Sequence, residues 1–159
     1  MDLSAYPLEL PEGDRPMVRF MNVTKSYGSL IVLDNLNLDV QRGEMVSVIG
    51  PSGSGKTTVL RMLMTLETIN GGVIYVDGMP LTHMAQGGRL VPADEAHLRR
   101  MRASIGMCFQ HFNLFPHMTA LQNCMEGPVQ VLGLSKLEAR ARAEELLAMA
   151  GMIAKKDQH

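Results

Sequence analysis

Residues 45–58 read MVSVIGPSGSGKTT, and this stretch decides the fold. Its first five residues form a short apolar run, which predicts a strand buried on both faces. From residue 57 to residue 66 the apolar side chains recur at helical spacing, which predicts a helix that ends before Asn70-Gly71-Gly72. A strand, a glycine-rich loop and a helix therefore follow one another, an order typical of α/β proteins.

The glycine-rich segment matches the pattern G-x-x-x-x-G-K-[ST] of a phosphate-binding P-loop. Its glycines let backbone N–H groups approach phosphates without side-chain clashes, and the positive end of the following helix faces the anion. We expect Lys56 to reach the β and γ phosphates of ATP and the Thr57 hydroxyl to ligate Mg²⁺. The alternative is a glycine-rich turn with a solvated lysine, but the pattern arises by chance in only about one such chain in a hundred. The cofactor-binding residues predicted here are Gly50, Ser52, Gly53, Ser54, Gly55, Lys56, Thr57 and Thr58.

Segments on both sides of the loop predict further elements. An extended segment begins at residues 18–23, and residues 36–40 alternate apolar and polar side chains, which indicates a half-exposed antiparallel pair. Residues 73–76 and 105–109 predict short strands, and residues 82–91 look like a polar insertion.

Three helices are predicted in the second half of the chain. One should start near Pro92, because acidic residues then fall in its first turn and arginines in its last. Thr119 with Gln122 and Ser135 with Glu138 have the spacing of capping boxes. The last helix should end at Gly151 and present one apolar face made of Ala139, Ala143, Leu146, Leu147 and Ala150.

The composition is that of one globular domain outside the membrane. The 159 residues are 46% hydrophobic and 19% charged, and the formal charge of −1 does not favour nucleic-acid binding. Cys108 and Cys124 form no C-x-x-C pair, which is typical of a reducing compartment. Residues 1–16 carry four acidic residues and three prolines and no signal-peptide pattern, so we expect a flexible leader. No apolar run reaches 18 residues, so a membrane association would require a partner.

Residues 43–58, GEMVSVIGPSGSGKTT, resemble the Walker A region of the ATPase subunits of ABC transporters. Tyr27, within VTKSYG at residues 23–28, stands where that family places an aromatic ring that stacks on adenine. Stacking suits this task because every base has a π face. A tyrosine of an edge strand is the alternative.

Gln110, within MCFQHFNLFPH at residues 107–117, matches the Q-loop glutamine of the same family. The resemblance implies a catalytic role for it, in contact with Mg²⁺ and the attacking water. Phe109, Phe112 and Phe115 either pack this segment onto the core or form part of a groove for a helix of the membrane subunit. Both readings stay open.

Two other residue patterns do not indicate a functional site. Residues 73–77, VIYVD, have the form of a Walker B strand, but Asp77 precedes Gly78 as in a hairpin turn, and no second carboxylate follows to activate water. The five histidines show no zinc-ligand spacing.

The resemblance implies an α/β P-loop NTPase of ABC ATPase type, with an antiparallel β subdomain and a RecA-like core. It covers residues 17–152 as a partial nucleotide-binding domain, followed by a tail at 153–159. The family's signature motif, Walker B aspartate, catalytic glutamate and switch histidine are missing from the chain. We therefore expect a fragment, truncated within or after the helical subdomain, that grips nucleotide and does not hydrolyse it.

The function implied is that of the ATP-binding subunit of an importer for polar amino acids or related compatible solutes. Its partners would be transmembrane permease subunits, a second ATPase subunit in a head-to-tail dimer and, indirectly, a solute-binding protein. It would lie on the cytoplasmic face of the membrane. Residues 81–101 resemble the subunit assigned to ectoine and hydroxyectoine uptake. The alternatives are another P-loop NTPase, such as a GTPase or small kinase, and a non-transport ABC protein that acts on nucleic acid.

Overall fold

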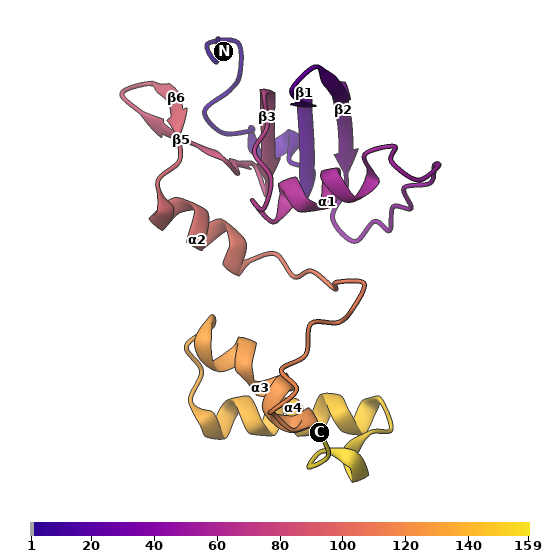
Figure 1. Ribbon diagram of the computed structural model, residues 1–159. Coiled ribbons are helices and arrows are strands. Elements are labelled where there is room, and N and C mark those ends of the chain that lie inside the picture. The colour runs from indigo at the N-terminus through magenta and orange to yellow at the C-terminus, as the bar shows by residue number, and fades with distance from the viewer. Residues whose placement is uncertain (1) are drawn as a thin grey trace. The chain divides into compact units, whose positions relative to one another are not determined.

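The structure, a computed structural model, describes residues 2–159 and divides into two compact units (Figure 1). The N-terminal unit comprises Met1–Gly106, of which Met1 lies outside the described residues. The C-terminal unit comprises Met107–His159. Each unit has its own hydrophobic cluster, so each is described separately.

The N-terminal unit is built on a four-stranded antiparallel sheet with the strand order β2-β1-β3-β4. The predicted antiparallel pair is confirmed, because β1 and β2 form a hairpin that turns at Gly28-Ser29. A separate hairpin of β5 and β6 turns at Gly87-Gly88, where both glycines have positive φ, so the polar stretch is a structured hairpin. The strands are β1 Val18–Tyr27, β2 Leu30–Val40, β3 Gly71–Val76, β4 Met79–Pro80, β5 His83–Gln86 and β6 Arg89–Pro92.

Two helices complete this unit. Helix α1, Lys56–Leu63, begins directly after the glycine-rich loop and lies beside the sheet in Figure 1. It ends three residues before the predicted end because Thr65 has a left-handed φ of 53°, which a continuing helix does not allow. Helix α2, Glu95–Ala103, is capped by the Asp94 side chain, close to the predicted start.

Strand β3 is buried on both faces, and its alternating side chains enter two clusters. On one face Ile74 and Val76 join the main core with Val59 and Met62 of α1. The other members of that core are Phe20, Val23, Leu81 and Met101. Because β3 lies between β1 and β4, burial of both its faces accounts for its apolar sequence.

The opposite face of β3 is covered by residues that precede the sheet. Val73 and Tyr75 form a cluster with Leu10 and Leu90, against which Leu3, Tyr6 and Leu8 pack. The Tyr75 hydroxyl donates a hydrogen bond of 2.6 Å to the Pro7 carbonyl. The segment expected to be a flexible leader thus contributes apolar side chains to the core of this unit, and it also contains a short 3-10 helix, Glu12–Asp14.

The two remaining strand predictions are wrong for this structure. Residues 45–49 form no strand, and the side chains of Met45 and Ile49 are 94% and 93% exposed. Residues 105–109 also have no regular structure. A strand needs a neighbour to satisfy its backbone hydrogen bonds, and none of the strands described for residues 2–159 pairs with either segment. The apolar sequence of residues 45–49 therefore lacks a surface to pack against.

The C-terminal unit contains two helices, α3 Ala120–Gln130 and α4 Lys136–Met149, and a 3-10 helix, Ile153–Lys155. Both predicted capping boxes are confirmed, with Thr119 and Ser135 as the N-caps. On the predicted apolar face, Ala139, Ala143 and Leu147 are buried, whereas Leu146 and Ala150 are exposed and do not belong to the hydrophobic cluster of this unit. Among the described residues, no helix has the length and apolarity needed to cross a membrane.

Candidate functional site: the glycine-rich loop and its surroundings

The glycine-rich loop packs against strand β2 at a point where only glycine fits. Gly55 has a φ of +86°, and a Cβ at this position would lie 3.0 Å from Val32 Cγ1 and 3.2 Å from Leu33 Cδ2. Gly53 also has a left-handed φ, of +82°, with open space around it. The glycine pattern is therefore a requirement of the backbone here, as the phosphate-loop prediction assumed.

The N-terminus of α1 differs from those of the other described α-helices in having no side-chain cap. Its N-cap is Gly55, and no acidic residue stands in its first turn. Helices α2, α3 and α4 are each capped by a side-chain oxygen, from Asp94, Thr119 and Ser135. The first backbone N–H groups of α1 are thus left without a side-chain acceptor, and the positive end of its dipole faces the loop. Such an end suits a phosphate group.

The Lys56 side chain folds over the loop that precedes it. Its ammonium donates hydrogen bonds to the carbonyls of Gly50, at 2.9 Å, and Pro51, at 2.7 Å, and to Ser54 Oγ at 3.3 Å. The positive charge is therefore held at the centre of the loop, in front of the start of α1. All three N–H donors of the ammonium go to protein oxygens in this structure, so phosphate oxygens would replace some of these acceptors when a nucleotide binds.

The remaining predicted loop residues surround this charge. Thr57 lies exposed in the first turn of α1, next to Lys56, where its hydroxyl is accessible to a cation. Thr58 is half-buried, while Ser52 and Gly53 are exposed in the loop. Glycine backbone, uncapped helix and central lysine together fit the phosphates of a nucleotide. The Thr57 hydroxyl is a hard oxygen donor of the kind that Mg²⁺ prefers.

Tyr27 lies at the end of β1, in the same unit as the loop. It pairs with Leu30 in the β1–β2 hairpin, and it is 46% exposed, which leaves ring surface open to a planar ligand. The Lys25 ammonium lies over its ring, 4.6 Å from the centroid. Lys25 is itself only 5% exposed and forms an ion pair of 2.8 Å with Glu67.

Glu67 was missed by the sequence reasoning. Hydrogen bonds from Lys25 and then from the Tyr27 side chain lower the pKa of this carboxyl below its usual value, which keeps it charged. Glu67 lies on the segment between α1 and β3. Its ion pair with Lys25 therefore connects this segment to strand β1, which carries Tyr27. One sequence signal existed, a lysine two positions before the tyrosine and so on the same face of the strand, but nothing in the sequence indicated its partner.

Gln110, predicted to be catalytic and to contact Mg²⁺, belongs to the C-terminal unit. It is exposed in a turn that follows residues without regular structure. Its roles stay predictions. Asp77 is confirmed as a turn residue: it has a φ of 50°, precedes Gly78 between β3 and β4, and forms an ion pair of 2.7 Å with Arg42. No cluster of potential metal ligands occurs among the described His, Cys, Asp and Glu residues.

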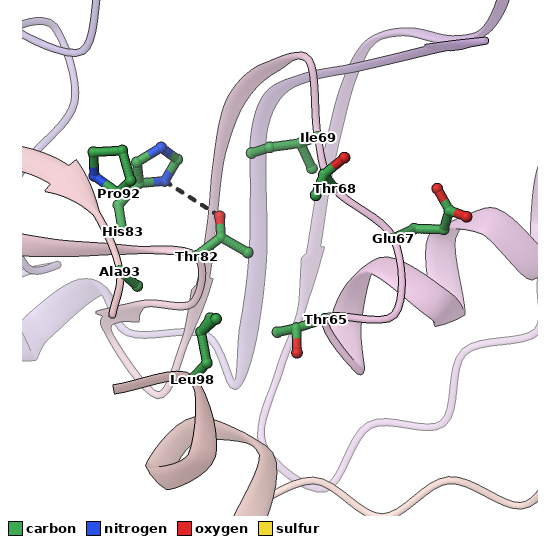
Figure 2. Close-up of a pocket in the computed structure, with 9 residues that line it drawn as sticks. All are labelled: Thr65, Glu67, Thr68, Ile69, Thr82, His83, Pro92, Ala93 and Leu98. Carbon is green, nitrogen blue, oxygen red and sulfur yellow. Dashed lines mark hydrogen bonds between the residues drawn. The ribbon is translucent and has the colours of Figure 1, made fainter. Parts of the chain in front are cut away.

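A pocket of about 270 Å³ lies elsewhere in the N-terminal unit (Figure 2). Inside it, His83 contacts the Thr82 hydroxyl at 3.2 Å, and burial lowers the pKa of the imidazole. None of residues 50–58 lines this pocket, so it is separate from the phosphate loop. Its lining residues are Thr65, Glu67, Thr68, Ile69, Thr82, His83, Pro92, Ala93 and Leu98.

The glycine backbone, the central lysine and the uncapped helix place the molecule in the class of P-loop proteins. Within that class, the model of the ABC transporter family matches residues 33–159. The chain belongs to this family of ATP-binding proteins. This assignment agrees with the resemblance of the loop sequence.

Among curated proteins, the chain is similar to a probable amino-acid ABC transporter ATP-binding protein, y4tH, of Sinorhizobium fredii. The two are 58% identical over 137 residues, which are 86% of this chain and 53% of the relative. It is 45% identical over 136 residues to the glutamine transport ATP-binding protein GlnQ of Escherichia coli, covering 86% of this chain and 52% of GlnQ. The chain thus spans about half the length of the curated relatives it matches.

Among solved structures, the chain resembles the ATP-binding cassette MJ0796 in a dimeric, post-hydrolysis state bound to ADP and phosphate. The TM-score is 0.73 at 37% identity, and the match covers 90% of this chain and 61% of that one. The predicted fold of the ABC ATPase family is therefore confirmed.

Proposed function

We propose that this chain binds Mg-ATP as part of the ATPase subunit of an ABC importer for polar amino acids or related compatible solutes. The observation that carries the proposal is the Lys56 ammonium, held over the loop in front of the one described α-helix whose N-terminus no side chain caps. Phosphate oxygens are the natural acceptors for both groups. The names of similar proteins, which refer to amino-acid and glutamine transport, support the solute class.

Each predicted residue has a defined task in this proposal. Lys56 and the backbone N–H groups of residues 50–58 bind the phosphates, and the Tyr27 ring stacks on adenine. Thr57 and Gln110 would hold Mg²⁺, and Gln110 would also orient the attacking water. Mg²⁺ held there would supply positive charge against the negatively charged phosphates. The Lys56 ammonium adds a second positive charge on the protein side.

The whole protein, on this proposal, hydrolyses ATP as a head-to-tail dimer beneath two permease subunits. It lies on the cytoplasmic face of the membrane and meets a solute-binding protein only indirectly. Support comes from the family of the chain and from the dimeric, post-hydrolysis state of the similar cassette MJ0796. Ectoine or hydroxyectoine would be a transported solute if the resemblance of residues 81–101 extends to function.

The proposal is tested by equilibrium binding of ATP to the Lys56→Ala variant. The change removes the charge at the loop centre, so we expect ATP binding to fall below detection while the circular dichroism and the melting temperature stay close to those of the parent. Arg61→Ala is the matched control, since it removes an exposed positive charge from the last turn of the same helix. Unchanged ATP affinity in Lys56→Ala would contradict the proposal.

A further inference from the structure

Lys25 is buried to a degree that lysines rarely reach unless they are paired. It is 5% exposed, although it lies only two residues before Tyr27, next to the turn of the β1–β2 hairpin. Burying an ammonium is costly unless it is paired and hydrogen-bonded. Here the carboxylate of Glu67 lies 2.8 Å away and provides that partner. A hydrophobic residue would fill the same space without the desolvation free energy that a buried charge requires, so packing alone does not account for the pair of Lys25 and Glu67.

Both charges act on the same aromatic ring. The Lys25 ammonium stands over the Tyr27 ring at 4.6 Å from its centroid, within the range of a cation–π interaction. Glu67 accepts hydrogen bonds from Lys25 and from Tyr27. The ring is thus held at one face by the cation and at its hydroxyl by the carboxylate, and its exposed surface stays available for a base.

Helix α1 and strand β2 connect the Tyr27 ring to the glycine-rich loop. Glu67 follows α1, and the first turn of α1 holds Lys56. At the start of this helix, Gly55 packs on Val32 and Leu33 of β2, and β2 pairs with β1, the strand that carries Tyr27. The place of the ring relative to the loop is therefore set by both ends of α1. A nucleotide that binds at the loop needs its base platform at a fixed distance and angle.

We infer that Lys25 and Glu67 are positioning residues, which lock the Tyr27 ring in the orientation that stacks on the base of a nucleotide held by the glycine-rich loop. This inference deepens the proposed function and rests on it. Neither residue touches the ligand; both act through Tyr27. Their loss should weaken recognition of the base and leave recognition of the phosphates intact.

The test compares two probes, ATP and inorganic tripolyphosphate, which carries the phosphates without a base. Binding of each is measured by calorimetry to the full chain and to its Lys25→Met and Glu67→Gln variants. We expect ATP affinity to fall roughly 3- to 10-fold in both variants, the range for loss of a cation–π contact or a charged hydrogen bond. Tripolyphosphate affinity should not change. Glu95→Gln is the matched control, because it breaks an exposed ion pair with Arg102 in the same unit.

Two further measurements separate positioning from general structural damage. In a Tyr27→Ala background, Glu67→Gln should cause no additional loss of ATP affinity, since the ring through which it acts is gone. Lys25→Arg, which keeps the charge, should restore most of the affinity lost in Lys25→Met. If Lys25→Met does not fold, as judged by thermal melting, Glu67→Gln and its double variant decide the question alone.

The inference is overturned if ATP and tripolyphosphate affinities fall together, or if Glu67→Gln weakens ATP binding as much in the Tyr27→Ala background as in the parent. Unchanged ATP affinity in folded Glu67→Gln would also overturn it. Failure of the proposed function looks different, because Lys56→Ala would then bind ATP and tripolyphosphate as the parent does.

Discussion

Tyr27 illustrates how one side chain combines exposure with constraint. Nearly half of it is open to solvent, as a stacking surface requires, yet its ring and hydroxyl contact two charged groups, one of them almost fully buried. An exposed aromatic ring free to rotate would lose entropy on stacking with a base. A ring already held in place loses less, and more of the stacking free energy appears as affinity.

Substitutions of Tyr27 separate the contribution of the ring from that of the hydroxyl. Tyr27→Ala removes the stacking surface and should cost roughly 1 to 3 kcal/mol of ATP binding, about 5- to 150-fold in affinity. Tyr27→Phe keeps the ring but loses the hydrogen bond to Glu67, so its loss should stay within about 5-fold. Calorimetric titration with ATP measures both. Equal losses in the two variants would show that the hydroxyl, and not the ring, is used.

Among the elements, strand β3 is the one on which both cores of the N-terminal unit depend. Tyr75 points toward the face that residues 3–10 cover, and its hydroxyl is bonded to the Pro7 carbonyl within that segment. Burial raises the pKa of Tyr75 to about 12. The folded state therefore holds the phenol proton more tightly than the unfolded state, in which the pKa is about 10.

The pH dependence of stability follows from this difference. Because the folded pKa is the higher one, the contribution of Tyr75 is fully present below about pH 10 and is lost as the pH rises from about 10 to about 12. At neutral pH, Tyr75→Phe should lower the free energy of unfolding by about 1 kcal/mol through loss of the hydrogen bond. The deficit should shrink above about pH 10, as measured by urea unfolding of both proteins. A constant deficit at every pH would exclude this explanation.

The whole molecule consists of two units, and the predicted ligand contacts divide between them. The loop and Tyr27 belong to the N-terminal unit, whereas Gln110 belongs to the C-terminal unit. ATP without Mg²⁺ therefore engages, on our proposal, groups of the N-terminal unit alone. Mg²⁺ would add the contact with Gln110.

This division predicts two steps of stabilisation. ATP at about 100 times its dissociation constant should stabilise the N-terminal unit by roughly 2.7 kcal/mol, and hydrogen exchange should slow around residues 50–63. Adding Mg²⁺ should extend the protection to the segment around Gln110, and Lys56→Ala should show neither effect. Absence of Mg²⁺-dependent protection at Gln110, with the ATP effect present, would refute the metal contact and leave the loop assignment standing.

The features that could be predicted from the sequence are those that depend on local backbone geometry. The glycine loop, the caps at Thr119 and Ser135 and the hairpin of β1 and β2 each depend on residues a few positions apart, whose conformational preferences act wherever the segment lies. The turn at Asp77-Gly78 was recognised for the same reason.

Only the tertiary structure decided which distant groups meet. Lys25 and Glu67 are ordinary charged residues in the sequence, and their pairing arises because the segment after α1 returns beside β1. The apolar run at residues 45–49 predicted a strand, but a strand exists only where a neighbour accepts its hydrogen bonds, and apolarity does not supply one. In the same way, the early segment read as a leader became core because β3 presents an apolar face that water would otherwise cover.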